Sequence, residues 1–400
     1  MELVPRFFSP PNESFFLFGA RGVGKSTILK DKFKKAKMLD LLDPSLYRQL
    51  TANPELLSEI ISGNPEVGIW IIDEIQRIPE LLPVVHQWIE KQWQESPHES
   101  EPNRRQFVLT GSSARKLKTT GVDLLGGRAL ECRLYPFIAS ELGSKFSLEV
   151  AIRKGMLPLV HHSRGYAAKL SGYLSLYMQL EVQAEGLVRS LPNFSRFLIS
   201  ISFSHGSILN YSDIARDCAI DAKTVRNYVD ILEDLLLAYR VPVFSNRAKR
   251  ELITANKFYY FDAGVYQSIR PRGVLDQPEE IAGAALEGLV YQHLLAWSSY
   301  RGRGDRVFFW RSRGGVEVDF VLYGESEFLA IEVKHSDQFD RKSLKALSEF
   351  HSDYPESRCL FVYRGKERFE RDGVLVLPAE EFLKSLDPAS SLTEIYHKKN

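Results

Sequence analysis

Residues Gly19 to Thr27 have the types and spacing of a loop that binds the phosphates of a nucleotide. Their sequence is GARGVGKST, which fits the P-loop spacing residue for residue. Glycines let successive backbone N–H groups turn toward one point, and a helix that begins there adds the positive end of its dipole. The sequence therefore predicts a nucleotide-binding loop made of Gly19, Gly22, Val23, Gly24, Lys25, Ser26 and Thr27.

Two side chains of this loop have predicted chemical roles. Lys25 is expected to reach the β- and γ-phosphates, and the Ser26 hydroxyl to complete the shell of a magnesium ion. The predicted cofactors are therefore ATP and Mg²⁺. The alternative is a glycine-rich turn with this spacing but without the function. The flanking pattern argues against it, because an apolar run (14–18) precedes the loop and a helical pattern (27–36) follows it.

An acidic pair follows the apolar residues of the segment GIWIIDE, which ends at Asp73 and Glu74. A fully apolar run is typical of a central parallel strand, and ligands in open α/β sheets bind beyond the carboxyl ends of such strands. In a P-loop enzyme the first acid helps to hold magnesium, and the second orients and deprotonates the attacking water. We assign these roles to Asp73 and Glu74 in that order. The alternative is a strand that ends in a solvated acidic pair.

Thr110 and Arg128 are two further candidates for the nucleotide site. Thr110 ends another apolar run (106–110), where its hydroxyl would sit beside the γ-phosphate; capping of the strand end explains this hydroxyl equally well. Arg128 follows two glycines and is the candidate for an arginine that completes the site of a neighbouring subunit. Its alternative role is a structural salt bridge.

A parallel sheet must bring these residues together. Short apolar runs that alternate with helical patterns are typical of an α/β domain. The predicted strands are 14–18, 38–42, 68–72, 106–110 and 129–134, and the predicted helices are 27–36, 45–61 with a break at Asn53-Pro54, and 79–93.

At these motifs the chain resembles the AAA-type ATPases, and specifically a prokaryotic family in which the ATPase precedes a C-terminal domain with nuclease-like motifs. The resemblance rests on GARGVGKST, IIDEIQ, LTGSS and the Gly-Gly-Arg before LYPFIASEL, and it continues through most of the chain. Nucleotides in such ATPases lie at subunit interfaces, so the resemblance implies a homo-oligomer. The segment 155–159 (GMLPL) departs from the family pattern, and no function is assigned to it.

The middle of the chain predicts a helix-turn-helix pattern. Helices are expected at 197–209, 212–218 and 221–237, with a strand at 257–262 and a wing within 241–255. If the last helix enters a DNA groove, its early polar residues make the contacts. These are Lys223, Thr224, Arg226 and Asn227. Winged-helix folds also serve as spacers or protein-contact modules, and such polar residues are also typical of a solvated face.

Two acids and a lysine are expected to meet on a hairpin near the C-terminus. Segment 315–322 alternates acidic and apolar residues, and FLAIEVK (328–334) returns after a turn, so Asp319 and Glu332 can lie side by side with Lys334 on the same face. Glu287 lies on a predicted upstream helix, 278–300. The alternative is that these charged residues lie on the solvent-facing edge of an ordinary hairpin.

This constellation resembles the active-site pattern of restriction-endonuclease-like nucleases. The resemblance implies metal-binding roles for Asp319 and Glu332, with Glu287 as an outer or second-metal ligand, and Mg²⁺ or Mn²⁺ as the ion. Lys334 would stabilise charge on the phosphorus or position the nucleophile. Arginines nearby, among them Arg311 and Arg313, would suit a DNA backbone. Such folds can also lose cleavage while retaining most of the motif.

Composition limits the remaining classes of protein. The 400 residues include 52 Lys plus Arg against 51 Asp plus Glu, so any nucleic-acid contact must come from local patches. Three cysteines lie far apart and argue against a zinc site or a disulfide framework. The N-terminus lacks a signal-peptide pattern, and no apolar stretch is long enough to span a membrane, so a cytoplasmic protein without a membrane partner is expected.

The predicted fold class is α/β, with a P-loop (AAA/ASCE-type) parallel-sheet domain, a helical and winged-helix region and a C-terminal α/β restriction-endonuclease-like domain. The predicted domains are 1–140 (P-loop ATPase), 141–195 (helical lid or linker), 196–277 (winged helix) and 278–400 (nuclease-like). The leading functional hypothesis is an Mg-dependent ATPase that controls a metal-dependent DNA nuclease. Its rivals are a nucleotide-gated DNA- or protein-binding switch with a silent nuclease-like domain, and a signalling switch that barely hydrolyses ATP.

Overall fold

The structure is a computed structural model that describes residues 3–95, 104–112, 127–161, 163–173, 182, 188, 190–245 and 256–397. The chain forms two compact units. One comprises Phe8–Tyr135 with Asp234–Leu236, and the other comprises Met1–Phe7, Pro136–Glu233 and Leu237–Asn400. The finer division into four domains stays a prediction. Within the described ranges, no helix is both long and apolar enough to cross a membrane.

The first unit is built on a five-stranded sheet of order β2-β3-β4-β1-β5. All four pairings are parallel, and the central strands are almost entirely buried because helices cover them. The strands are β1 (Phe15–Phe18), β2 (Lys37–Asp40), β3 (Ile69–Asp73), β4 (Gln106–Gly111) and β5 (Leu130–Arg133). The five predicted strands and the α/β class of this unit are therefore confirmed.

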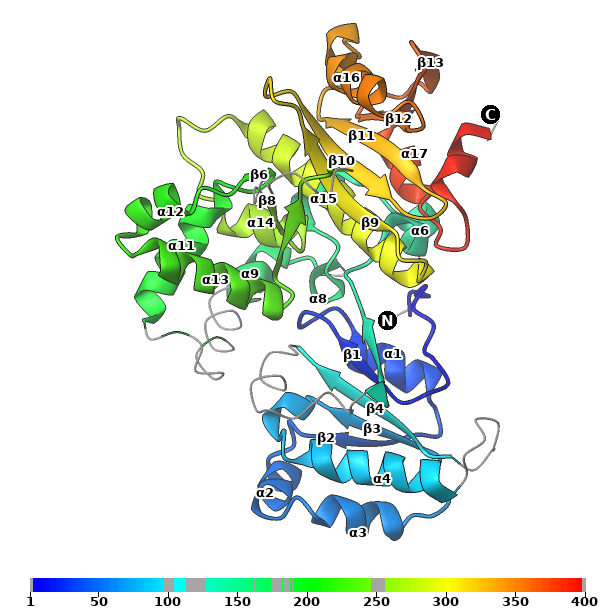
Figure 1. The fold of residues 1–400 in the computed structure, drawn as a ribbon. Coiled ribbons are helices and arrows are strands. Elements are labelled where there is room, and N and C mark those ends of the chain that lie inside the picture. The colour runs from blue at the N-terminus through cyan, green and yellow to red at the C-terminus, as the bar shows by residue number, and fades with distance from the viewer. Residues whose placement is uncertain are drawn as a thin grey trace. The chain divides into compact units, whose positions relative to one another are not determined.

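The helices of this unit are α1 (Lys25–Lys32), α2 (Pro44–Ala52), α3 (Leu56–Ser62) and α4 (Leu81–Glu95), with a 3-10 turn η1 at Ile75–Arg77. Figure 1 shows α2, α3 and α4 together beside the sheet, and α3 packs against both of the others. The predicted break at Asn53-Pro54 separates α2 from α3. The first helix is shorter than predicted, because Phe33 leaves the helical conformation and its ring lies 6.3 Å from that of Phe15 in the core.

The second unit contains a mixed six-stranded sheet of order β13-β14-β12-β11-β10-β9. Strands β11, β12 and β14 run parallel to one another, and the other pairings are antiparallel. The strands are β9 (Arg306–Arg311), β10 (Glu317–Tyr323), β11 (Phe328–Lys334), β12 (Arg358–Tyr363), β13 (Phe369–Arg371) and β14 (Val374–Pro378). The predicted hairpin of two strands before Lys334 is thus confirmed.

Helices pack on this mixed sheet. α15 (Pro278–Arg301) contacts β9 and β11, and its Tyr291 stacks on Phe320 with ring centroids 6.0 Å apart. α16 (Lys345–Asp353) places Leu347 and Phe350 in an apolar cluster with Val321 of β10. α17 (Ala379–Lys384) follows β14 directly. The predicted helix 278–300 is confirmed as α15.

A smaller antiparallel sheet of order β6-β8-β7 lies in the same unit, with β6 (Ser207–Ile208), β7 (Ala238–Pro242) and β8 (Asn256–Tyr260). The remaining α-helices within the described residues are α6 (Ala139–Leu142), α7 (Leu148–Lys154), α8 (Pro158–His161), α9 (Tyr166–Gly172), α11 (Leu191–Ser202), α12 (Tyr211–Cys218), α13 (Ala222–Asp234) and α14 (Ala263–Ile269). Most of the predicted wing (246–255) lies outside the described residues.

The first helix of the predicted helix-turn-helix begins and ends earlier than expected. Ser190 accepts a hydrogen bond from the backbone N–H of Asn193, and Pro192 occupies the first turn, so α11 starts at Leu191. It ends at Ser202, because the chain then turns into the short strand β6. The other two helices match the predicted positions to within about three residues.

Candidate functional site

The loop after β1 has the backbone of a phosphate-binding turn. Gly22 and Gly24 adopt φ values of 82° and 98°, which residues other than glycine rarely adopt. A Cβ atom at Gly19 would lie 2.5 Å from the carbonyl oxygen of Leu134, so this position also requires glycine. Gly24 is the N-cap of α1, and the helix begins at Lys25. The helix N-terminus and the loop therefore face the same point.

Lys25 lies in the loop rather than in solvent. The residue is 5% exposed, and its Nζ donates a hydrogen bond of 2.7 Å to the carbonyl oxygen of Gly19. This places a buried ammonium group against the glycine turn. A cation held there is suited to an anionic ligand, because the low dielectric of the site strengthens the attraction.

The residues predicted to hold magnesium meet at the carboxyl ends of the strands. The Ser26 hydroxyl donates a hydrogen bond of 2.7 Å to Oδ2 of Asp73, and the Thr110 hydroxyl donates to Oδ1 of the same carboxylate. Asp73 is 4% exposed, and Thr110 is completely buried. A serine hydroxyl beside a carboxylate at this edge fits an Mg²⁺ ion that a bound nucleotide brings with it.

Glu74 is held in an unusual backbone conformation. Its φ and ψ of 61° and 46° lie in the left-handed region, which costs energy for a residue with a side chain. Its backbone N–H donates a hydrogen bond of 3.1 Å to Oγ1 of Thr110. Thr110 thus links the two acids, and this contact supports the capping role for its hydroxyl.

Sequence reasoning missed Gln76. This buried side chain donates from Nε2 to the Glu74 carboxylate, and also to the Ser112 hydroxyl at 3.1 Å. It therefore orients the candidate base. A signal was present, because IIDEIQ places a glutamine two residues beyond the acidic pair. Ser113 lies outside the described residues.

Arg128 makes the salt bridge that was its alternative role. Its Nε lies 2.7 Å from Oε1 of Glu90, and its guanidinium lies 5.8 Å from the ring centre of Trp93. The side chain is still 43% exposed. Its role in a neighbouring subunit stays a prediction.

The predicted acids of the second unit do come together. The register of β10 and β11 pairs Phe320 with Ile331, which places Asp319 opposite Glu332. Oδ2 of Asp319 accepts a hydrogen bond of 2.9 Å from the backbone N–H of Val333. Lys334 forms an ion pair with Glu332 and remains 43% exposed. Asp319, Glu332 and Lys334 therefore form one group.

Lys257 of β8, which sequence reasoning missed, enters this group from the smaller sheet. Its Nζ lies 3.1 Å from Oε1 of Glu287, 2.7 Å from Oε1 of Glu317 and 3.3 Å from Oδ1 of Asp319. Tyr259, two residues along the same strand, donates its hydroxyl to Glu287. We call Glu287, Glu317 and Asp319, with Lys257, the lysine–carboxylate cluster. The available signal was a lysine inside the apolar strand KFYYFD.

The lysine–carboxylate cluster does not fit a divalent metal ion as it is arranged. An ammonium group lies among the carboxylates, at a position where a cation would be expected. In the described part of the chain, no group of three or more His, Cys, Asp or Glu residues is placed to hold a metal. Glu287, Asp319 and Glu332 are thus close together, but their arrangement does not provide the metal site that the motif predicts.

Burial shifts the pKa values of these groups strongly. Burial, reinforced by repulsion from Asp319, raises the pKa of Glu287 to about 7 and that of Glu332 to about 8. Burial acts to lower the pKa of Lys257, but the surrounding acidic groups outweigh it, and the pKa lies well above its ordinary value. Lys257 is therefore a permanent cation at neutral pH.

The predicted DNA-binding residues are mostly exposed. Lys223, Arg226 and Asn227 lie on the accessible side of α13. The backbone N–H and the hydroxyl of Thr224 donate hydrogen bonds to the carboxylate of Asp221, which caps the start of the helix. Arg226 also lies over the ring of Tyr211. Arg311 and Arg313, the arginines predicted to suit a DNA backbone, are exposed beside the β9–β10 turn.

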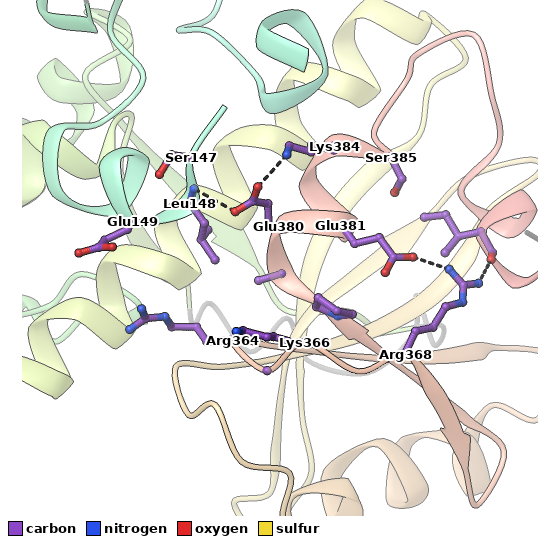
Figure 2. A pocket seen from close by; sticks show the side chains of 14 residues that line it. Ser147, Leu148, Glu149, Arg364, Lys366, Arg368, Glu380, Glu381, Lys384 and Ser385 are labelled. Atoms are coloured by element: carbon purple, nitrogen blue, oxygen red, sulfur yellow. Dashed lines mark hydrogen bonds and ion pairs between the residues drawn. The ribbon is translucent and has the colours of Figure 1, made fainter. Parts of the chain in front are cut away.

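A pocket of about 850 Å³ lies beyond the carboxyl ends of β12 and β14 (Figure 2). Its charged residues are of both signs, and several pair with each other. Lys384 lies 2.7 Å from Glu380, and Arg368 lies 2.6 Å from Glu381. Glu149, Arg364 and Lys366 also line this pocket.

The parallel sheet, the glycine loop at the end of β1 and the acids at the end of β3 are the arrangement of a P-loop ATPase. Residues 11–143 match the family model described as "AAA domain". Segments 145–275 and 282–382 match models described as domains of unknown function (DUF8612 and DUF4143).

Relatives extend over nearly the whole chain. An uncharacterized protein of Mycobacterium tuberculosis is 26% identical over 378 residues, which cover 92% of this chain and 80% of that protein. An uncharacterized protein of Haemophilus influenzae is 22% identical over 387 residues, covering 91% and 88%. Among solved structures, a Walker-type ATPase of Pyrococcus abyssi is similar with a TM-score of 0.41 and 17% identity, covering 64% of this chain and 91% of that one.

Proposed function

We propose that this protein is an Mg-dependent ATP hydrolase of AAA type whose ATP cycle controls a restriction-endonuclease-like, DNA-binding C-terminal part. The observation that carries the ATPase proposal is the hydrogen-bonded chain from Ser26 through Asp73 and Thr110 to Glu74. It joins the predicted magnesium ligands to the predicted base. The AAA match of residues 11–143 supports the same activity.

Each residue of the nucleotide site has a role in this proposal. Backbone N–H groups of the loop and Lys25 bind the phosphates, and Ser26 and Asp73 hold the Mg²⁺ that neutralises phosphate charge. Glu74 orients the attacking water and takes its proton, while Thr110 holds the Glu74 backbone in place. Arg128 would complete the site of a neighbouring subunit in a homo-oligomer.

Phosphate release with ATP and Mg²⁺ tests the ATPase proposal. We expect turnover by the wild type and a loss of about 100-fold or more in Glu74→Gln, since a general base contributes about that factor. ATP binding should persist in this variant. Glu80→Gln is the matched control, because Glu80 is an exposed acid close by in the chain. A wild type that binds ATP without releasing phosphate would instead support a signalling switch.

The convergence of Asp319, Glu332 and Lys334 with Glu287 supports the nuclease-like assignment of the C-terminal part. Because the lysine–carboxylate cluster does not fit a divalent ion, we favour DNA binding without cleavage over a metal-dependent nuclease. The exposed residues Lys223, Arg226, Arg311 and Arg313 are suited to phosphate contacts.

Two measurements test the C-terminal part. DNA affinity should fall as the salt concentration rises. Replacing either Arg311 or Arg313 with alanine should reduce by about one the slope of the logarithm of the binding constant against the logarithm of salt concentration. Incubation of plasmid with Mg²⁺ or Mn²⁺ should leave it intact. Cleavage that Asp319→Ala abolishes would establish the nuclease instead.

Assembly is a separate part of the proposal. We expect ATP to increase the size of the particle in a sizing measurement, and Arg128→Ala to reduce turnover in the assembled form. A stable monomer with and without ATP would remove the role proposed for Arg128.

A further inference from the structure

We propose that Lys257 is the resident cation of the lysine–carboxylate cluster, so that the nuclease-like part holds an ammonium group where a nuclease would hold a metal ion. The inference rests on the proposed nuclease-like character of this part, and it goes further by naming the residue that excludes the metal. It is carried by contacts, burial and strand pairing.

The ammonium group of Lys257 donates hydrogen bonds to Glu287 and Asp319 and forms an ion pair with Glu317. An ammonium group has three N–H bonds, and three carboxylates surround this one at 2.7 to 3.3 Å. The carboxylates come from two elements, with Glu287 on α15 and the other two on β10. The lysine side chain is 1% exposed. A charge buried to this extent is stable only when it is paired, so the cluster requires its lysine.

A divalent ion has no room beside this ammonium group. Mg²⁺, Mn²⁺ or Ca²⁺ would need carboxylate oxygens at about 2.0 to 2.6 Å. The oxygens nearest to Lys257 already surround its nitrogen, and Oε1 of Glu287 also accepts the Tyr259 hydroxyl. A second cation at this point would face strong repulsion at low dielectric. Metal binding would therefore require the lysine to leave.

Lys257 cannot leave by a simple change of side-chain position. Its backbone lies in the middle strand of the smaller sheet, where it pairs with Val241 of β7 and Ile208 of β6. The next residues of the strand, Phe258 and Tyr259, are completely buried. Moving the backbone would break strand pairing on both sides. Moving the side chain alone would take the shared ammonium group away from three carboxylates, whose other contacts are the Tyr259 hydroxyl on Glu287, the Val333 N–H on Asp319 and Arg311 at 3.9 Å from Glu317.

Binding of Mn²⁺, followed by electron paramagnetic resonance of the free ion, tests this inference. The full-length chain is used without nucleotide and with Ser26→Ala, so that the P-loop contributes no ion. With Lys257 present, we expect the added Mn²⁺ to remain free. Lys257→Met should bind about one Mn²⁺ per chain, and adding Asp319→Asn should abolish that binding. Lys342→Met, at an exposed lysine of the same unit, should bind none.

Two results would overturn the inference. One is Mn²⁺ binding by the chain that retains Lys257, if Asp319→Asn removes it. This measurement needs no change at Lys257, so it decides the question even if the methionine variant does not fold. The other is a folded Lys257→Met chain that binds no Mn²⁺. Neither result affects the proposed ATPase, which phosphate release by the wild type tests separately.

Discussion

The hydroxyl of Ser26 donates a hydrogen bond of 2.7 Å to Oδ2 of Asp73 and joins two segments that lie 47 residues apart in the chain. Both groups are oxygen donors at the carboxyl edge of the sheet, which is the kind of ligand that Mg²⁺ prefers. Their direct contact shows that the two predicted magnesium ligands belong to one site.

Replacing Ser26 with alanine should raise the Mg²⁺ requirement of ATP hydrolysis. The variant keeps the loop backbone but loses one oxygen donor and the partner of Asp73. We expect the Mg²⁺ concentration for half-maximal phosphate release to rise about 10-fold or more, because even residues that only support a metal ligand contribute about 10- to 100-fold and Ser26 is proposed as a ligand itself. Ser45→Ala, at an exposed serine of α2, is the control. An unchanged Mg²⁺ requirement would contradict the assignment.

Gln76 should act as a positioning residue for Glu74. Gln76→Leu preserves size but removes the hydrogen bonds to Glu74 and Ser112. Loss of one hydrogen bond to a charged group, worth about 1.5 kcal/mol, corresponds to about a tenfold lower turnover. The KM for ATP should stay near that of the wild type, because Gln76 holds the base and not the nucleotide. Steady-state kinetics would separate the two parameters, and a rise in KM at unchanged kcat would argue against this role.

Asp262 should make the second unit more stable in mild acid than at neutral pH. Burial raises the pKa of this carboxyl to about 6, against the hydrogen bonds that it accepts from backbone N–H groups, among them those of Met156 and Val265. The native state therefore holds its proton more tightly than the unfolded state. The resulting stabilisation is complete below about pH 4, and it is lost as the pH rises through about 6.

Asp262→Asn should remove this pH dependence. The free energy of unfolding of the wild type relative to the variant is expected to fall by on the order of 2 kcal/mol between pH 4 and pH 7. Denaturant titrations at several pH values would measure it. Asparagine has a single acceptor oxygen, so the free energy of unfolding of the variant should also be lower than that of the wild type at every pH. A constant difference between the two proteins would show that Asp262 does not titrate as expected.

Glu141 should be essential to the stability of the second unit. Both of its oxygens lie 3.0 Å from Nε of Arg6, and they also accept the backbone N–H groups of Phe7 and Ile138. The side chains of Arg6 and Glu141 are 6% and 0% exposed. Glu141→Gln leaves a buried guanidinium without its counter-charge, which costs about 3 kcal/mol or more. Urea unfolding should show a lower midpoint than for Glu149→Gln, an exposed control. Equal midpoints would refute this.

The sequence by itself determined the features that depend on neighbouring residues. The glycine spacing of residues 19 to 27 predicts the loop, because glycine adopts the positive φ values of this loop at little energetic cost. Apolar runs predict the five strands, since a parallel strand covered on both faces must be apolar throughout. The alternation before Lys334 places Asp319 opposite Glu332, because a short hairpin sets the register of its two strands.

The tertiary structure decided which distant groups meet. Lys257 lies 62 residues before Asp319 on a strand of a different sheet, and no local pattern indicates that the two approach. The same holds for Gln76, whose partner Ser112 lies 36 residues away, directly after β4. Contacts of this kind follow from how sheets and helices pack together, and the period of side chains along one strand carries no information about them. For this reason the sequence predicts a cluster of acids on the hairpin, and only the fold shows that Lys257 lies among the acids.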